Sequence, residues 1–322
     1  MTRRFLASQA VAASLAGCVF LDASSAAIPI VAQAHSPVPS VCGAACVETQ
    51  FLDVGSVRYA WRRLGPAGKP PLVMVNRFRG TMDEWDSAFI DALARNHDVI
   101  LFDNVGVART NGVASDHLTG WADGAAAFID ALGLSSVDVF GFSFGGLVSQ
   151  ELAYRRPDLV RRLVIAGSGA GYVEGANLSP EAIRVATKPV NDDEDFLFLF
   201  FRQTPTSQAA GRAHLARLRQ RSDAFEALVS APTWRSMLSA GSDVGTAQTS
   251  LLNRAPTLHI PVLVANGVQD NMIPTFQSYA LAQALPEARL VIYPDSGHAF
   301  MFQHVEAFAA EVTAFLDEPA AP

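Results

Sequence analysis

The sequence predicts an α/β fold in which a mainly parallel sheet is flanked by helices and an α-helical cap is inserted between two strands. Short apolar runs typical of buried strands alternate with segments of helical spacing from about residue 51, and this alternation favours parallel strands covered on both faces. The alternation stops between Gly169 and His259 and then resumes. In residues 137–154 a buried strand runs directly into a serine flanked by glycines and then into a helix.

Length and composition limit the classes of protein to consider. With 322 residues, the chain can bury one large core or two small ones. The formal net charge is -7 and the sequence has no long basic run, so nucleic acid is not expected as a partner, because phosphate binding needs clustered Lys and Arg. Beyond the N-terminus no apolar run approaches the ~18 residues of a membrane span. We therefore expect an ordered globular protein.

Residues 1–34 are similar to an export signal. Two arginines precede the uncharged apolar segment 5–21. Two cleavage sites compete: Leu15–Cys18 resembles a lipobox, in which Cys18 would be lipidated, whereas a small-x-small site ends at Ala34. The sequence thus predicts a periplasmic, secreted or lipid-anchored protein that contacts a membrane only through its N-terminal segment. It carries no signal for the oligomeric state.

The cysteine count fits export. Cys18 is removed or lipidated in both cases, which leaves Cys42 and Cys46 as a pair in the mature N-terminal arm, residues 35–50. A disulfide that closes so short a loop stabilises by about 2 kcal/mol. The alternative is two free thiols if the chain is not exported. A lone C-x-x-x-C offers two ligands where zinc needs three or four, so we expect no metal site.

The first part of the core, residues 51–168, reads as a regular succession of elements. Gly55-Ser56 is the predicted turn between the first two strands, and residues 66–71 are the loop before the third. The predicted strands are 51–54, 57–61, 72–75, 99–102, 137–140 and 162–166, and the predicted helices are 85–94, 121–132 and 147–154.

Residues 169–259 form the predicted cap, and residues 260–322 complete the core with strands at 262–265 and 290–293 and helices at 276–285 and 305–316. An insertion at this point lies over the carboxyl edge of the sheet, where α/β folds place their active sites. The aromatic run Phe196–Phe201 is too apolar to face water alone. We expect it to line the interface between cap and core and in part to wall the substrate pocket.

Strand, G-x-S-x-G and helix in this order make a nucleophile elbow. The turn is so sharp that Ser143 takes strained backbone angles, and the flanking Gly141 and Gly145 leave room for it. A serine hydroxyl is a poor nucleophile at neutral pH and needs an adjacent base. Asp270 and His298 each follow a predicted strand, and strand ends converge on one edge. Asp103 also follows a strand, but it precedes the elbow.

With these motifs, residues 50–316 resemble the α/β-hydrolase superfamily, in its serine-nucleophile, esterase-like branch. The order Ser143, Asp270, His298 is the order of that fold. The resemblance implies that Ser143 attacks a carbonyl, His298 takes its proton, and Asp270 fixes the histidine tautomer. Asp103 matches a structural turn of the superfamily. The remaining histidines are not expected to take part in chemistry: 35, 97, 117, 214, 259 and 304.

The superfamily stabilises the developing negative charge with two backbone N–H groups, the oxyanion hole. Phe144, directly after the nucleophile, supplies one. Phe78 is matched to the second, in a loop where Asn76-Arg77 replaces the His-Gly common in relatives. Arg77 and Arg79 either recognise a substrate carboxylate or, as we expect, pair with local acids, for which the candidates are Asp83, Glu84, Asp86 and Asp103.

A serine in the elbow indicates acyl transfer, because the superfamily's epoxide hydrolases and haloalkane dehalogenases use aspartate there. The sequence thus predicts a hydrolase that cleaves a small-molecule ester or lactone through an acyl-enzyme, without a cofactor. The apolar cap suggests an apolar acyl or alcohol part. Carbon–carbon bond hydrolysis, cofactor-free perhydrolase activity with the same triad, and a non-catalytic binding protein are the alternatives.

Overall fold

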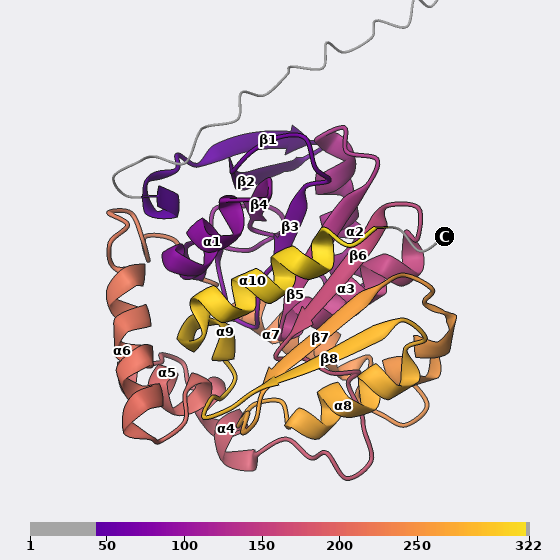
Figure 1. Ribbon diagram of the computed structural model, residues 1–322. Coiled ribbons are helices and arrows are strands. Elements are labelled where there is room, and N and C mark those ends of the chain that lie inside the picture. The colour runs from indigo at the N-terminus through magenta and orange to yellow at the C-terminus, as the bar shows by residue number, and fades with distance from the viewer. Residues whose placement is uncertain (1–42, 320–322) are drawn as a thin grey trace, which may run out of the picture. The chain divides into compact units, whose positions relative to one another are not determined.

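The computed structural model describes residues 43–319 (Figure 1). The predicted export signal, both cleavage sites and Cys42 lie outside these residues. The described chain begins with a 3-10 helix, η1 (Gly43–Cys46), whose Ala44 N–H donates to Asp91 at 2.6 Å. Cys46 is disulfide-bonded. Among the described residues, no helix is long and apolar enough to cross a bilayer.

The core is one eight-stranded sheet with the order β1-β2-β4-β3-β5-β6-β7-β8. β1 pairs with β2 and β2 with β4 in antiparallel fashion, and all other pairs are parallel. The strands are β1 (Gln50–Val54), β2 (Val57–Leu64), β3 (Leu72–Val75), β4 (Val99–Phe102), β5 (Val137–Phe142), β6 (Val160–Ala166), β7 (Val262–Gly267) and β8 (Ala288–Tyr293). The predicted mainly parallel sheet is thereby confirmed.

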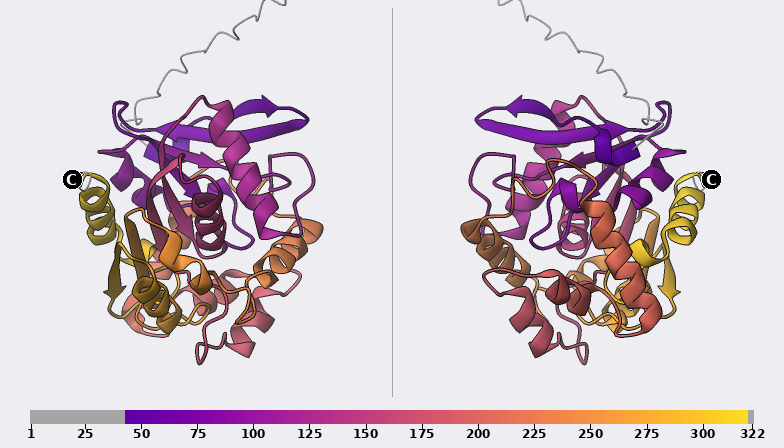
Figure 2. Two further views of the ribbon diagram at one scale, coloured as in Figure 1. Left: turned by 90° about the vertical axis from the view of Figure 1, so that its right-hand side faces the viewer. Right: turned by 90° about the vertical axis from the view of Figure 1, so that its left-hand side faces the viewer.

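Helices cover both faces of this sheet because the inner strands are apolar on both sides. β3, β4, β5 and β7 are buried at every residue. One face packs against α1 (Ser87–Ala94) and α10 (Val305–Leu316). The other packs against α2 (Leu118–Ala131), α3 (Phe144–Arg155) and α8 (Thr275–Ala284). Figure 2 shows α10 and α2 on opposite sides of the strands.

Several helices differ in detail from the prediction: α1 begins at Ser87 rather than at 85, and α3 at Phe144 rather than at 147. α2 begins at Leu118 rather than at 121, because the Leu118 N–H donates to Asp243 Oδ2 at 2.8 Å, a partner 125 residues away. A short helix, α9 (Phe300–Gln303), precedes α10.

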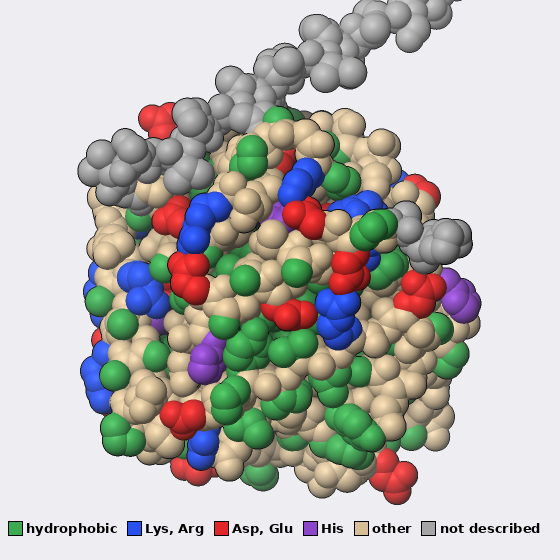
Figure 3. All heavy atoms as spheres, in the orientation of Figure 1, with side chains coloured by type: hydrophobic (Ala, Val, Ile, Leu, Met, Phe, Trp, Pro, Cys, Tyr) green, Lys and Arg blue, Asp and Glu red, His purple; other side chains and the backbone are tan. Residues whose placement is uncertain are grey.

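On the face over α1 and α10, acidic and basic side chains are interspersed (Figure 3), as in the pair Arg95–Glu306 at 2.6 Å. This face therefore offers no continuous basic surface.

The segment between β6 and β7 contains no strand. It holds α4 (Pro180–Ala186), α5 (Asp193–Phe200), α6 (Pro205–Leu218), α7 (Ala231–Ser242) and the 3-10 helices η3 (Leu251–Asn253) and η4 (Ala255–Thr257). It reaches the carboxyl edge of the sheet through α5, where the Phe200 carbonyl accepts from the Ala299 N–H at 2.9 Å. All these elements fall within the predicted cap, residues 169–259, whose boundaries as a domain stay a prediction.

Candidate active site

The serine turn between β5 and α3 has the strained geometry that its sequence predicts. Ser143 has φ 55 and ψ -118, in the region that favours glycine. Its N–H donates to the Ala166 carbonyl of β6 at 2.9 Å. A Cβ on Gly145 would collide with the carbonyl oxygen of Val75 in β3. The turn is thus held by strands on both sides, and only glycine allows the close approach of α3 to β3.

Asp270 and His298 come together at the carboxyl edge of the sheet, Asp270 after β7 and His298 after β8. His298 Nδ1 lies 2.7 Å from Asp270 Oδ2, and both side chains are fully buried. Asp270 Oδ1 accepts from the N–H groups of Met272 and Ile273 at 2.7 and 2.9 Å. Both carboxylate oxygens are therefore fixed, and they hold the imidazole by its Nδ1.

The other nitrogen of His298 is free. Nε2 is buried and has no hydrogen-bond partner among the described residues. The ring lies between Phe142, the residue before Ser143, and Phe200 of α5, with centroids 5.0 and 5.3 Å away. Ser143 is only 6% exposed, and its hydroxyl likewise forms no bond within residues 43–319. Hydrogen bonds of this type often tighten only when substrate is bound.

A cavity of about 450 Å³ opens over Ser143. Phe78 and Phe144 line it together with Ser143, and the N–H groups of both phenylalanines have no acceptor in the described part of the chain. The inserted segment contributes apolar side chains, including Ile183 of α4 and Leu238 of α7. No residue that lines the cavity carries a charge.

The loop 76–80 is stabilised by hydrogen bonds from its own side chains. Asn76 Oδ1 accepts from the Arg77 N–H at 2.7 Å, and the Asn76 amide nitrogen donates to the Thr81 carbonyl. The Gly80 N–H closes a turn on the Arg77 carbonyl at 3.0 Å, with Arg79 at φ 55. Arg77 donates to the Phe78 carbonyl at 2.9 Å and to Glu84 at 2.5 Å. Asn76 and Arg77 thus support the loop by side-chain bonds.

The expected pairing with local acids is confirmed for Arg77, through Glu84, and is wrong for Arg79. The Arg79 guanidinium donates instead to three carbonyls of the inserted segment, those of Ala186, Lys188 and Pro189, at 3.1, 2.6 and 3.2 Å. These acceptors lie more than 100 residues along the chain and come close only through the tertiary fold.

Asp103 makes no bond to a histidine within residues 43–319. Its Oδ1 accepts from the Met82 N–H at 2.7 Å, and its carbonyl accepts from the Thr110 hydroxyl at 2.7 Å. Burial raises the pKa of Asp103 to about 7. Its contacts are those of a structural turn residue.

A second buried histidine–aspartate pair was not predicted from the sequence. His214 Nδ1 of α6 lies 2.7 Å from Asp86 Oδ2, at the N-terminus of α1, and both side chains are fully buried. The partners are 128 residues apart, so no local pattern could have found them. Residues 43–319 hold no group of three or more His, Cys, Asp or Glu side chains placed to bind a metal ion.

The fold and the serine turn together define the class of protein. The family model described as alpha/beta hydrolase fold matches residues 70–305, and the chain therefore belongs to this family. Several of its relatives are named as hydrolases, and the chain is an enzyme of the hydrolase type.

Individual relatives resemble most of the chain. A 2-hydroxymuconate semialdehyde hydrolase of Pseudomonas putida is 33% identical over 202 residues, which cover 62% of this chain and 68% of that protein. A poly(3-hydroxyalkanoate) depolymerase of Ectopseudomonas oleovorans is 29% identical over 84% of this chain and 92% of its own length. Among solved structures, an alpha/beta hydrolase fold protein from Chitinophaga pinensis has 34% identity and a TM-score of 0.79, and covers 85% of this chain and 99% of its own.

The raised pKa of Asp103 predicts that Asp103→Asn stabilises the folded protein relative to wild type by an amount that grows with pH. A carboxyl with a pKa near 4 in the unfolded chain and about 7 in the folded one favours the folded state as a neutral acid, so the wild type loses stability as the pH rises between these values. Asparagine cannot ionise, and its oxygen still accepts from Met82. The free energy of unfolding of the variant, relative to wild type, should rise by at most about 1.4 kcal/mol per pH unit from pH 4 to 7 and then level off.

Urea unfolding at intervals from pH 4 to 8 measures this difference. A difference that does not change with pH would show that Asp103 titrates alike in the folded and unfolded chain.

Proposed function

We propose that this protein is a serine hydrolase that cleaves a carboxylic ester or lactone through an acyl-enzyme intermediate. The observation that carries the proposal is the buried His298–Asp270 hydrogen bond of 2.7 Å, which leaves Nε2 without a partner among the described residues while the ring packs on Phe142, the residue before the strained Ser143. An imidazole fixed at Nδ1 by a carboxylate presents Nε2 as a base.

In the proposed reaction, the Ser143 hydroxyl attacks the substrate carbonyl while His298 Nε2 accepts its proton. The negative charge that develops on the carbonyl oxygen is held by the N–H groups of Phe78 and Phe144, which line the same cavity. The protonated His298 returns the proton to the leaving alkoxide, and the acyl group stays on Ser143. A water molecule, deprotonated by His298, then attacks the acyl-enzyme. His298 returns this proton to the Ser143 oxygen as the acid leaves.

The cavity supports a substrate whose acyl or alcohol part is apolar and uncharged. Its lining is free of charged side chains, and moving a charge into such surroundings without a partner is unfavourable. Both Ile183 and Leu238 are partly exposed, at 47% and 43%, so the apolar lining continues to the surface of the inserted segment.

Three relatives bear on the choice of bond. The depolymerase is named for poly(3-hydroxyalkanoate), a polyester, which supports ester cleavage. Two relatives are named for 2-hydroxymuconate semialdehyde, which is not an ester. Their similarity favours carbon–carbon bond hydrolysis with the same three residues as the second candidate.

Removing the nucleophile tests the mechanism. Ser143→Ala and His298→Ala should each lower kcat on para-nitrophenyl esters by at least about a thousandfold, and the double variant should be little worse than either, because the two residues act as a unit. Ser239→Ala, a change at an exposed serine of α7, is the control. A fluorophosphonate probe should label wild type and not Ser143→Ala.

If folded wild-type protein is not labelled, Ser143 is not an activated nucleophile. If the wild-type protein is labelled and hydrolyses a vinylogous diketone but no ester or lactone, carbon–carbon bond hydrolysis replaces the proposed reaction.

The neutral cavity predicts discrimination against charged acyl chains. The para-nitrophenyl ester of hexanoate should exceed the mono-ester of adipate in kcat/KM by about a hundredfold, because the free carboxylate finds no partner in the cavity. Leu238→Arg places a cation at the rim and should narrow this ratio, whereas Val113→Arg, at a position 90% exposed that does not line the cavity, should leave it unchanged. Equal rates for both esters in wild type would mean that the acyl chain binds elsewhere.

We also propose that the chain is exported, as its first 34 residues predict. The disulfide at Cys46 supports this, because such bonds persist in oxidising compartments. The mass of the mature protein from its host should correspond to a chain that begins at acylated Cys18 or at His35. Recovery of the full-length chain from the cytosol would contradict export.

A further inference from the structure

Three acidic residues directly follow the loop that carries Phe78. Asp83, Glu84 and Asp86 lie at the end of the 3-10 helix η2 (Met82–Glu84) and the start of α1. The side chains of Asp83, Glu84 and Asp86 are 1%, 14% and 0% exposed. Buried carboxylates need compensating partners, and these three obtain them from different parts of the molecule.

Glu84 binds the loop. Its Oε1 accepts from Arg77 at 2.5 Å and its Oε2 from the Thr81 N–H at 2.9 Å. Because Arg77 also donates to the Phe78 carbonyl at 2.9 Å, the position of Glu84 determines the orientation of the loop that presents the Phe78 N–H.

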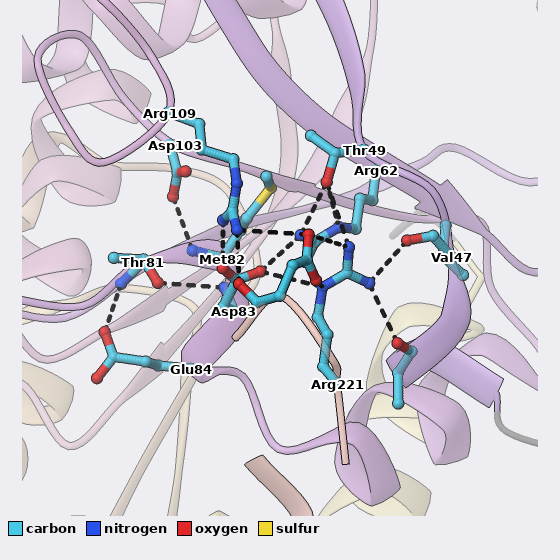
Figure 4. A network of polar contacts seen from close by, with 12 residues as sticks. Val47, Thr49, Arg62, Thr81, Met82, Asp83, Glu84, Asp103, Arg109 and Arg221 are labelled. Carbon is cyan, nitrogen blue, oxygen red and sulfur yellow. Dashed lines mark hydrogen bonds and ion pairs between the residues drawn. The ribbon is translucent and has the colours of Figure 1, made fainter. Parts of the chain in front are cut away.

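Asp83 is shared between the core and the inserted segment. Figure 4 shows its carboxylate among three guanidinium groups: Arg62 of β2 at 2.5 Å, Arg109, and Arg221 at 3.4 Å. Arg221 follows α6 and is itself held by Asp223 at 2.6 Å. Arg221 also donates to the carbonyls of Ala45 and Val47, at 3.2 and 2.9 Å.

Asp86 is bound by α6 itself. Arg217 donates to both of its oxygens, at 2.8 and 2.6 Å, and His214 lies 2.7 Å from Oδ2. Asp86 also begins α1, because its Oδ1 accepts from the Ala88 N–H at 3.0 Å. The cations of α6 and of the residues after it thus compensate two acids on either side of Glu84.

We infer that residues 83–86 form a junction through which α6 and Arg221 position the loop 76–80, which carries the Phe78 N–H. Arg217 and Arg221 are thus positioning residues for the proposed reaction. The inference rests on the proposed function. Neither arginine lines the cavity over Ser143, whose walls from the inserted segment include residues of α4 and α7 but none of α6. Their effect on the reaction is therefore indirect: Arg221 contacts Asp83, which adjoins Glu84, and Glu84 binds the loop whose N–H acts on the charge that develops in the transition state.

The test replaces each arginine with methionine, which is similar in length and uncharged. Arg221→Met leaves Asp83 with Arg62 and Arg109, so no buried acid is left alone. Arg217→Met leaves Asp86 with His214. Arg212→Met, at an exposed position of α6, is the matched control. Circular dichroism establishes that each variant is folded, and Arg221→Met alone carries the test if Arg217→Met does not fold.

On para-nitrophenyl acetate, whose acyl group has only two carbons, both variants should lose about tenfold in kcat, a fraction of the effect of deleting one oxyanion donor. KM should stay within about twofold, because the loss arises only in the transition state. Affinity for a trifluoromethyl ketone, which forms a charged tetrahedral adduct with the serine, should fall in parallel with kcat. The control should match wild type in all three measurements.

Unchanged kcat on acetate in folded Arg221→Met overturns the inference, as does a loss confined to KM for long-chain esters, which would indicate a purely structural role in the cap. In both cases the wild type still turns over esters and loses this activity in Ser143→Ala, so the proposed function stands. Absence of Ser143-dependent turnover in wild type overturns the proposed function and the inference with it.

Discussion

The close approach of α3 to β3 at Gly145 is the contact on which the rest of the site depends. It forces the chain to turn at Ser143 within one residue, and the resulting backbone, with φ 55, costs on the order of 1–3 kcal/mol. The turn persists because the strands around it are fully buried and because Ala166 accepts the Ser143 N–H. The serine is therefore held at the carboxyl edge of the sheet, where the ends of β7 and β8 bring Asp270 and His298.

Aromatic packing connects this edge to the inserted segment. The ring of His298 contacts Phe142 from the core and Phe200 from α5. Phe302 packs against Phe142 and stacks on His214 of α6, with ring centroids 5.8 and 4.4 Å apart. Both histidines thus lie in one group of phenylalanines, with their Nδ1 atoms on carboxylates. Such packing excludes water and strengthens the hydrogen bonds within it.

Buried carboxylates near the site differ in their partners, and the partners decide what each can do. Asp270 accepts two N–H groups and the imidazole, which suits it to orient a base. Asp83 is paired with three arginines and Asp86 with Arg217 and His214, and both acids connect the parts of the chain that meet there. The carboxylate of Asp103 accepts from the Met82 N–H and has no ion pair within residues 43–319, and burial raises its pKa.

The sequence by itself determined the features that depend only on residues close together in the chain. Apolar runs, and alternation of apolar and polar residues in the first two strands, located all eight strands. Strands 72–75 and 99–102 have the same bounds in the structure, because a strand buried on both faces must be apolar along its length. The serine turn was equally local. Only the tertiary structure decided the partners that are distant in sequence. Asp243 accepts from the first N–H of α2, Arg79 donates to carbonyls of the inserted segment, and Arg217 of α6 donates to Asp86. A polar side chain does not encode its partner in its neighbours, because the pairing is chosen by whichever group the folded chain brings within reach.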